Sequence, residues 1–142
     1  MKTSKSITSA LLIGTLAFWF ASALFVEAAG AAALAARTSD AEGVRVEVTP
    51  KLADSGAAVW EFEVVMDTHS KELSTDLAQT AVLTDDTGRD YAPIAWQGDP
   101  PGGHHREGIL QFPPPAGNPK SVELKIKDIG GVSERIFRWE LD

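Results

Sequence analysis

Apolar and polar residues alternate along most of the chain after residue 43, and this period of two predicts β-strands with one solvated face. In GVRVEVTP, three valines alternate with charged residues. In AAVWEFEVVM, Trp60, Phe62, Val64 and Met66 alternate with polar or smaller residues, which makes this the strongest predicted strand. The same alternation assigns Met66 to the core.

Five further segments have strand character: TAVLTD, DYAPIAW, GILQF, SVELKIK and ERIFRWEL. The DDTG sequence between Leu83 and Tyr91 predicts a hairpin turn, and residues 74–80 predict a short helical turn. Seven short strands separated by turn signals predict an all-β sandwich of immunoglobulin-like or fibronectin-like architecture. The expected core aromatic residues are Trp60, Phe62, Trp96, Phe112, Phe137 and Trp139.

The amino-terminal segment has a different pattern, because residues 10–26 carry no charge and follow two lysines. This run is longer than the usual signal core of about 7–15 residues. It lies at the short end of the roughly 17–25 residues that span a bilayer. Residues 1–36 are therefore predicted to be a signal peptide or a single transmembrane anchor, with possible cleavage sites at 26–28 and 33–35. The run length favours the anchor.

Both alternatives export the rest of the chain, because lysines before the apolar run stay in the cytoplasm. The predicted location is periplasmic or extracellular, either anchored to the membrane or secreted. Residues 37–43 are predicted to be a polar linker, and residues 44–142 a single sandwich domain.

Composition excludes several classes of function. The net charge of −7 argues against a nucleic-acid partner, which needs a basic surface, and suits a site that attracts cations. The chain has no cysteine, so it has no disulfide, no thiolate metal site and no thiol nucleophile. Ser70 adjoins His69 but adjacency alone does not make a catalytic pair, and no G-x-S-x-G elbow is present. We therefore expect a protein that is not an enzyme.

All three histidines are predicted to meet at one end of the sandwich. His69 follows the second predicted strand, and His104 and His105 lie in GDPPGGHHREG, which reads as a loop. Antiparallel connections alternate between the two ends, so both loops and the later KDIGGVSE turn share one end. The other charged residues expected there are Asp67, Asp76, Asp99, Arg106 and Asp128.

Two interpretations of this end stay open. In the first, His69, His104 and His105 bind copper or zinc, with Asp67 or Asp99 completing the set. No established metal-binding spacing supports it. In the second, the histidines form hydrogen bonds with loop backbone and carboxylates, and Arg106 pairs with a carboxylate. The carboxylates proposed for Arg106 are Asp67, Asp128 and Glu134.

These interpretations give two functional hypotheses. The first is a binding domain tethered to the membrane by its amino-terminal helix, with copper or zinc as the most concrete ligand. The second is a structural or adhesive module that binds a protein partner through a sheet face or edge. GVRVEVTP is also expected to be an exposed edge strand, able to pair with a neighbouring copy.

The motifs DTHS, GGHHREG and GGVSERIFRW together resemble a family of short exported prokaryotic β-domain proteins. The resemblance covers roughly residues 58–141. It implies a small secreted or membrane-tethered β-domain in which the motifs at His69, His104–Arg106 and Gly130–Gly131 lie together. It transfers no catalytic residue.

Overall fold

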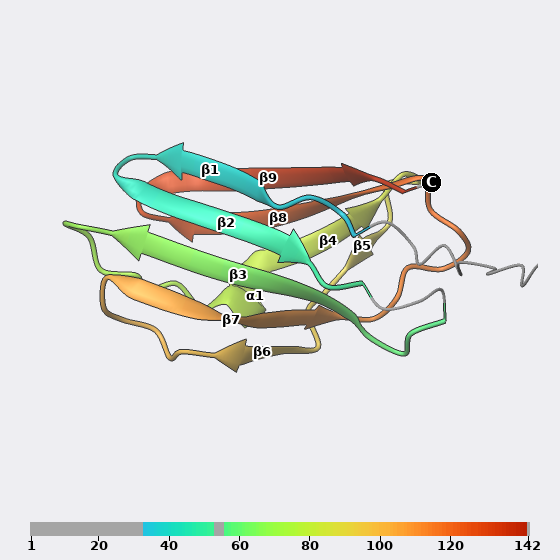
Figure 1. Cartoon of the computed structure of the whole chain (residues 1–142), viewed down its shortest axis with the longest axis horizontal. Coiled ribbons are helices and arrows are strands. Elements are labelled where there is room, and N and C mark those ends of the chain that lie inside the picture. The colour runs from blue at the N-terminus through green and yellow to red at the C-terminus, as the bar shows by residue number, and fades with distance from the viewer. Residues whose placement is uncertain (1–32, 53–55, 142) are drawn as a thin grey trace, which may run out of the picture.

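The computed structural model describes residues 33–52 and 56–141, which form two antiparallel β-sheets (Figure 1). The all-β prediction is therefore confirmed. The elements are β1 (Arg37–Ala41), β2 (Val44–Pro50), β3 (Trp60–Thr68), α1 (Leu77–Thr80), β4 (Ala81–Asp85), β5 (Asp90–Tyr91), β6 (Ala95–Gly98), β7 (His105–Phe112), β8 (Ser121–Ile129) and β9 (Val132–Glu140).

The five-stranded sheet has the order β1-β2-β3-β7-β6, and the four-stranded sheet has the order β5-β4-β8-β9. The five-stranded sheet faces the viewer in Figure 1, and the four-stranded sheet lies behind it. The predicted apolar helix falls within residues 1–32, outside the described residues. Within the described part of the chain, no helix has the length and apolar character needed to cross a membrane.

The described residues contain nine strands rather than the seven predicted, because two segments behave differently from expectation. Residues 37–43, predicted as a linker, form β1 and a tight turn to β2. Glu42 and Gly43 occupy that turn with φ of 53° and 72°, the left-handed geometry of a two-residue hairpin loop. The strand escaped prediction because RTSDA is almost entirely polar and mostly exposed at a sheet edge. The expectation that GVRVEVTP forms an edge strand is wrong, because β1 pairs with β2 on its outer side.

The predicted single strand DYAPIAW is split into β5 and β6, which belong to different sheets. Pro93 lies between them and cannot donate a ladder hydrogen bond, which favours a break at this point. The hairpin predicted around DDTG is confirmed, because Leu83 pairs with Tyr91 and Thr84 with Asp90. The predicted helical turn is confirmed as α1.

The core lies between the two sheets, where the predicted alternation places its apolar residues. Phe62, Val64 and Met66 on β3 are fully buried. The Phe62 ring packs edge-on against Phe112 with centroids 5.8 Å apart, and lies 5.6 Å from the Trp139 ring. Trp60 and Trp96 are only partly buried at the core margin.

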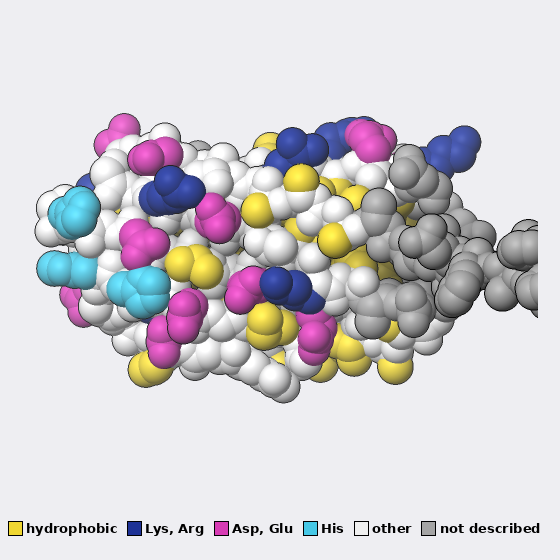
Figure 2. All heavy atoms as spheres, in the orientation of Figure 1, with side chains coloured by type: hydrophobic (Ala, Val, Ile, Leu, Met, Phe, Trp, Pro, Cys, Tyr) yellow, Lys and Arg dark blue, Asp and Glu magenta, His cyan; other side chains and the backbone are white. Residues whose placement is uncertain are grey.

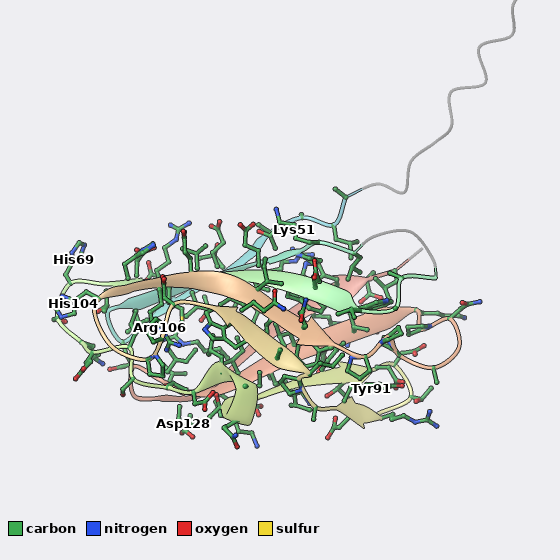
Figure 3. The ribbon with its side chains drawn as sticks, turned by 90° about the horizontal axis from the view of Figure 1, so that it is seen from below. Lys51, His69, Tyr91, His104, Arg106 and Asp128 are labelled. Carbon is green, nitrogen blue, oxygen red and sulfur yellow. The ribbon has the colours of Figure 1, made fainter. Side chains whose placement is uncertain are left out.

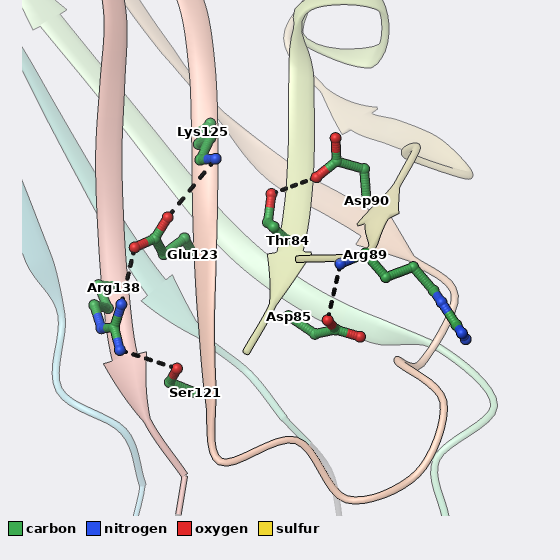
Figure 4. Close-up of polar contacts among 8 residues, drawn as sticks. All are labelled: Thr84, Asp85, Arg89, Asp90, Ser121, Glu123, Lys125 and Arg138. Atoms are coloured by element: carbon green, nitrogen blue, oxygen red, sulfur yellow. Dashed lines mark hydrogen bonds and ion pairs between the residues drawn. The ribbon is translucent and has the colours of Figure 1, made fainter. Parts of the chain in front are cut away.

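The outer face of the four-stranded sheet carries a network of charged and polar side chains (Figure 4). Glu123 lies between Lys125 and Arg138, with closest approaches of 3.7 and 3.0 Å. Thr84 donates to the Asp90 carboxylate at 2.7 Å. The ion pairs are only partly exposed, and such surface pairs contribute little to stability, about 0–1 kcal/mol each. We interpret the face as an ordinary polar surface.

Candidate functional site

The loops that bear the histidines lie together at one end of the two sheets. The Thr68 amide donates to the His104 carbonyl at 2.9 Å, and Asp67 pairs with His105 across β3 and β7. Figure 3 shows His69 and His104 at the same tip. We call this tip, formed by residues 42–43, 69–76, 99–104 and 130–131, the histidine end. The predicted convergence of the two loops is confirmed.

His105 is the first residue of β7, not part of a loop as predicted. Its Nδ1 lies 2.6 Å from Asp67 Oδ1, and its Nε2 lies 3.6 Å from Glu107 Oε2. The hydrogen bond to Asp67 raises the pKa of His105 above its usual value, and the charges of Asp67 and Glu107 add to this effect. Both ring nitrogens therefore face carboxylates, as the network interpretation expects for this histidine.

Asp99, the other carboxylate predicted as a ligand, makes a different set of contacts. Its Oδ2 accepts from the Glu107 amide at 2.9 Å, and its carbonyl accepts from the Trp96 indole at 2.8 Å. Asp76 caps α1 by accepting from the Ala78 amide at 3.0 Å. These carboxylates thus fix the backbone locally rather than turning toward one shared point.

The predicted metal site does not exist as a preformed cluster in the described part of the chain. Among residues 33–52 and 56–141, no group of three or more His, Cys, Asp or Glu side chains is arranged to hold a metal ion. A metal at His69, His104 and His105, with Asp67 or Asp99, would require side chains to rearrange. Metal binding stays a prediction.

Arg106 is the main link between the two loops of the histidine end. Its side chain is 1 % exposed, and Nη1 donates to the carbonyls of Leu73 at 2.8 Å and Thr75 at 2.7 Å. Nη2 donates to the Asp99 carbonyl at 3.3 Å. The predicted pairing of Arg106 with a carboxylate is wrong, because the buried donors meet backbone oxygens instead. Burial lowers the pKa of Arg106.

The Trp96 ring packs beside this guanidinium, with Arg106 Cζ 5.8 Å from the ring centroid. Two glycines make room for the indole on the inner face of β6 and β7. A Cβ at Gly98 or Gly108 would lie 2.8 Å from Trp96 Cζ2, and about as close to the other strand's backbone. The small residues therefore allow Trp96 to cover the two strands and contact the buried cation.

Arg135 links the β1–β2 and β8–β9 hairpins at this end, as Arg106 links the two loops. The sequence analysis did not identify it. It is 2 % exposed and lies on β9. Nη1 donates to Ser39 Oγ at 2.9 Å and the Val44 carbonyl at 3.1 Å. Nη2 donates to the carbonyls of Ala41 at 2.9 Å and Ile129 at 3.3 Å.

A sequence signal for Arg135 existed. It has the same parity as Phe137 and Trp139 in ERIFRWEL, so the alternation places a charged residue on the inner face. Lys71 adds a third cation at this end, donating from Nζ to the Gly130 carbonyl at 2.6 Å. None of the ion pairs between described residues includes Arg106 or Arg135.

The opposite tip, which we call the far end, consists of the described residues in 33–36, 51–59, 86–89, 113–120 and 141 (Figure 1). The buried charge next to it is Asp85, the last residue of β4, which is 7 % exposed. Asp85 Oδ1 accepts from Thr87 Oγ1 at 2.6 Å and from the amides of Thr87 at 2.9 Å and Arg89 at 3.0 Å. Tyr91 donates to Oδ2 at 2.9 Å. The Thr87 hydroxyl, with these other donors, lowers the pKa of Asp85 to about 2.

Comparison with known proteins identifies no relative. No family model, no curated protein and no solved structure matches the chain.

Proposed function

We propose that the protein is an exported, non-enzymatic interaction domain whose histidine end binds a protein partner. The observation that supports this most is the set of Arg106 hydrogen bonds to Leu73, Thr75 and Asp99, because they hold both histidine-bearing loops on one rigid scaffold. His69 and His104 are exposed on these loops. A surface fixed before binding loses less conformational freedom when a partner docks.

We also infer an immunoglobulin-like architecture from the strand order. The run β2-β3-β7-β6 in one sheet and β4-β8-β9 in the other corresponds to the ABED and CFG order of that fold. β1 and β5 are additions at the sheet edges. Domains of this kind commonly recognise partners through the loops at one end, which agrees with a role for the histidine end.

We propose further that the amino-terminal segment stays attached as a membrane anchor. Leu34 packs against the core, and the Trp139 indole donates to the Ala35 carbonyl at 2.7 Å. Cleavage at the second possible site, after Ala35, would remove both contacts from the folded domain. The packing of Leu34 and Ala35 therefore argues against that site. Cleavage after Ala28 would keep both contacts, so the preference for an uncut chain rests on the length of the apolar run.

Site-specific photo-crosslinking in the producing cells tests the partner hypothesis. A benzoylphenylalanine is placed at Ser70 on the histidine end, or at the matched exposed position Asn118 on the far end. We expect a discrete adduct from position 70 only, lost when His69→Ala and His104→Ala are combined in the same chain. Equal adducts from both positions, or none from position 70, would refute the proposal.

Copper or zinc remains a second candidate ligand, because His69 and His104 are exposed on loops joined by the Thr68–His104 backbone bond. Calorimetric titration with Cu(II) and Zn(II) tests this candidate. Heat at micromolar metal, lost in His104→Ala and in His105→Ala, would support it. No heat in the unmodified chain would exclude a metal site of useful affinity and leave the protein-partner hypothesis standing.

A further inference from the structure

We propose that the far end of the domain faces and contacts the surface of a bilayer that contains anionic phospholipid, so that the histidine end points away from the membrane. The proposal rests on the anchored form of the proposed function. It adds an orientation and a second contact surface, which the anchor alone does not determine.

The first argument is the place where the chain enters the domain. Residues 33–36 lie at the far end, where Leu34 packs on the core margin and Ala35 accepts the Trp139 hydrogen bond. From there β1 runs toward the histidine end (Figure 1). A tether formed by the preceding residues therefore attaches to the far end, at the opposite tip from His69 and His104.

The second argument is the length of that tether. If the uncharged run of residues 10–26 occupies the bilayer, only residues 27–33 separate it from Leu34. An extended chain spans at most about 3.6 Å per residue, so the tether reaches less than about 30 Å. This is about the length of a nine-residue strand such as β3, at roughly 3.3 Å per residue. The far end is therefore held near the membrane surface.

The third argument is the difference in charge between the two ends. The far end exposes Lys51, Arg89 and Lys120 against Asp86, although Lys51 lies 2.9 Å from Glu63. The exposed charged residues at the strand ends beside it are Arg37, Asp90 and Glu140. The histidine-end loops carry one half-buried lysine, Lys71, and several acids, and Figure 2 shows histidine and acidic side chains gathered there. Those acids are the exposed Glu42, Glu72 and Asp76 and the half-buried Asp99.

Two more carboxylates, Asp54 and Asp142, are adjacent in sequence to far-end residues but lie outside the described residues. Counting them still leaves the far end more positive than the histidine end. An anionic bilayer attracts cations close to its surface and repels carboxylates. Electrostatics therefore turns the far end toward such a bilayer and the histidine end away from it.

The partly buried hydrophobic residues at the margin of the core also favour a membrane contact at the far end. Five of the six partly buried hydrophobic residues at this margin belong to the far end or to strand residues next to it. They include Trp60 and Tyr91, and aromatic residues of these two types favour the boundary between lipid and water. The five residues are Leu34, Leu52, Trp60, Tyr91 and Leu141.

A domain lying flat on its five-stranded sheet is the main alternative orientation. The outer face of that sheet presents many carboxylates, which anionic lipid would repel. Two of its cations, Arg45 and Lys51, are each 2.9 Å from a glutamate. The carboxylates are Asp40, Glu47, Glu61, Glu63, Asp67 and Glu107. The upright orientation is therefore favoured over this one.

Fluorescence energy transfer in nanodiscs measures the orientation with the full-length chain. The chain has no cysteine, so Ser70→Cys and Asn118→Cys each provide a single labelling site, one at each end. The acceptor is attached to lipid headgroups in discs of phosphatidylcholine and phosphatidylglycerol. We expect more efficient transfer from position 118 than from position 70. Equal transfer, or more from position 70, would overturn the proposal.

Charge reversal tests the role of the far-end cations. Arg37→Glu, Arg89→Glu and Lys120→Glu are combined in one chain, and Arg45→Glu, Lys125→Glu and Lys127→Glu form the matched control away from this end. In the unmodified chain, transfer should be more efficient in discs with phosphatidylglycerol than in discs of phosphatidylcholine alone. The first variant should lose this difference between the two lipids, and the control should keep it. Circular dichroism confirms that both chains fold. Loss in both chains, or in neither, would contradict a specific contact.

Liposome flotation separates failure of this inference from failure of the anchor. A full-length chain that does not float with phosphatidylcholine vesicles has no anchor, which would refute the anchored form of the proposed function and this inference with it. A chain that floats but shows no difference between positions 70 and 118 refutes only the orientation. Neither result bears on whether the histidine end binds a partner.

Discussion

The two ends of the domain stabilise their loops with buried charges of opposite sign. At the histidine end, Arg106 and Arg135 donate hydrogen bonds to backbone carbonyls. At the far end, Asp85 accepts hydrogen bonds from backbone amides in the turn that follows β4. Each charge is buried, and each makes hydrogen bonds to main-chain groups in turns, loops or hairpin ends.

This difference shows that the backbone determines which side chain is needed. The 86–89 turn directs amides inward, so a carboxylate serves there. The loops and hairpins at the histidine end direct carbonyls inward, and the five donors of a guanidinium can reach several at once. The fit is incomplete, because the Nε of Arg106 and the Nε of Arg135 have no partner among the described residues. Each therefore adds a desolvation cost.

The comparison also predicts different responses to pH. Arginine stays protonated at any pH that leaves the protein intact, so the contacts of Arg106 and Arg135 do not titrate. Asp85 does titrate, because its carboxylate gains a proton in acid. The far end should consequently loosen in acid before the buried arginine contacts do.

The largest effect is expected for Arg135→Met, which removes the buried hydrogen bonds that join the β1–β2 and β8–β9 hairpins. We expect the free energy of unfolding to fall by about 2–4 kcal/mol, measured by urea denaturation. Arg138→Met on the same strand is the matched control. Its side chain is 55 % exposed, so about 0–1 kcal/mol is expected. Equal losses in both variants would show that the buried contacts of Arg135 have no special role.

Arg106→Met should destabilise the protein by a similar or smaller amount, about 2–3 kcal/mol. It has fewer contacts, but they hold both histidine-bearing loops. Hydrogen exchange measures this directly at the amides of Leu73 and Gly102, which bond across the two loops. We expect faster exchange at these amides and no change in the 86–89 turn. Faster exchange at both ends would mean that the two ends are not independent.

Replacing Asp85 with Asn should flatten the response of stability to acid. The pKa of Asp85 is about 2 in the folded protein and near 3.8 when unperturbed. The stability it contributes is therefore fully present above about pH 4 and is lost as the pH falls toward 2. Urea denaturation between pH 2 and 6 should show a steeper acid loss in the unmodified chain than in Asp85→Asn.

Exposed Glu72, replaced with Gln, is the control for that experiment. It should follow the unmodified chain across the whole range. If Asp85→Asn were as sensitive to acid as the unmodified chain, other carboxylates would account for acid unfolding.

The smallest effect is expected from the Asp67–His105 pair, because both side chains are more than half exposed. The pKa of His105 is raised above 6.5, so the pair stabilises the fold below that pH. This contribution is lost as the pH rises through the folded pKa. NMR titration should place the His105 imidazole above 6.5 and show a lower value in Asp67→Asn. An unchanged value would remove Asp67 as the cause.

Local pattern was sufficient for the elements whose signals are strong. The alternation in AAVWEFEVVM correctly placed Phe62, Val64 and Met66 in the core, and DDTG correctly marked the β4–β5 turn. It failed for β1, since a polar edge strand has no buried face to reveal it. The pattern also failed to show that DYAPIAW divides into β5 and β6. The sheet that each strand joins depends on which strand, distant in sequence, has a free edge to pair with.

For the site, the sequence determined that both histidine-bearing loops reach one end, because antiparallel strands reverse direction at each connection. The partners of the buried charges were decided only by the tertiary structure. Arg106 meets carbonyls of Leu73 and Thr75, and Arg135 meets Ser39 and Val44, which are more than 30 and more than 90 residues away. Such contacts depend on where backbone carbonyls point once two sheets pack, and no local pattern encodes that direction.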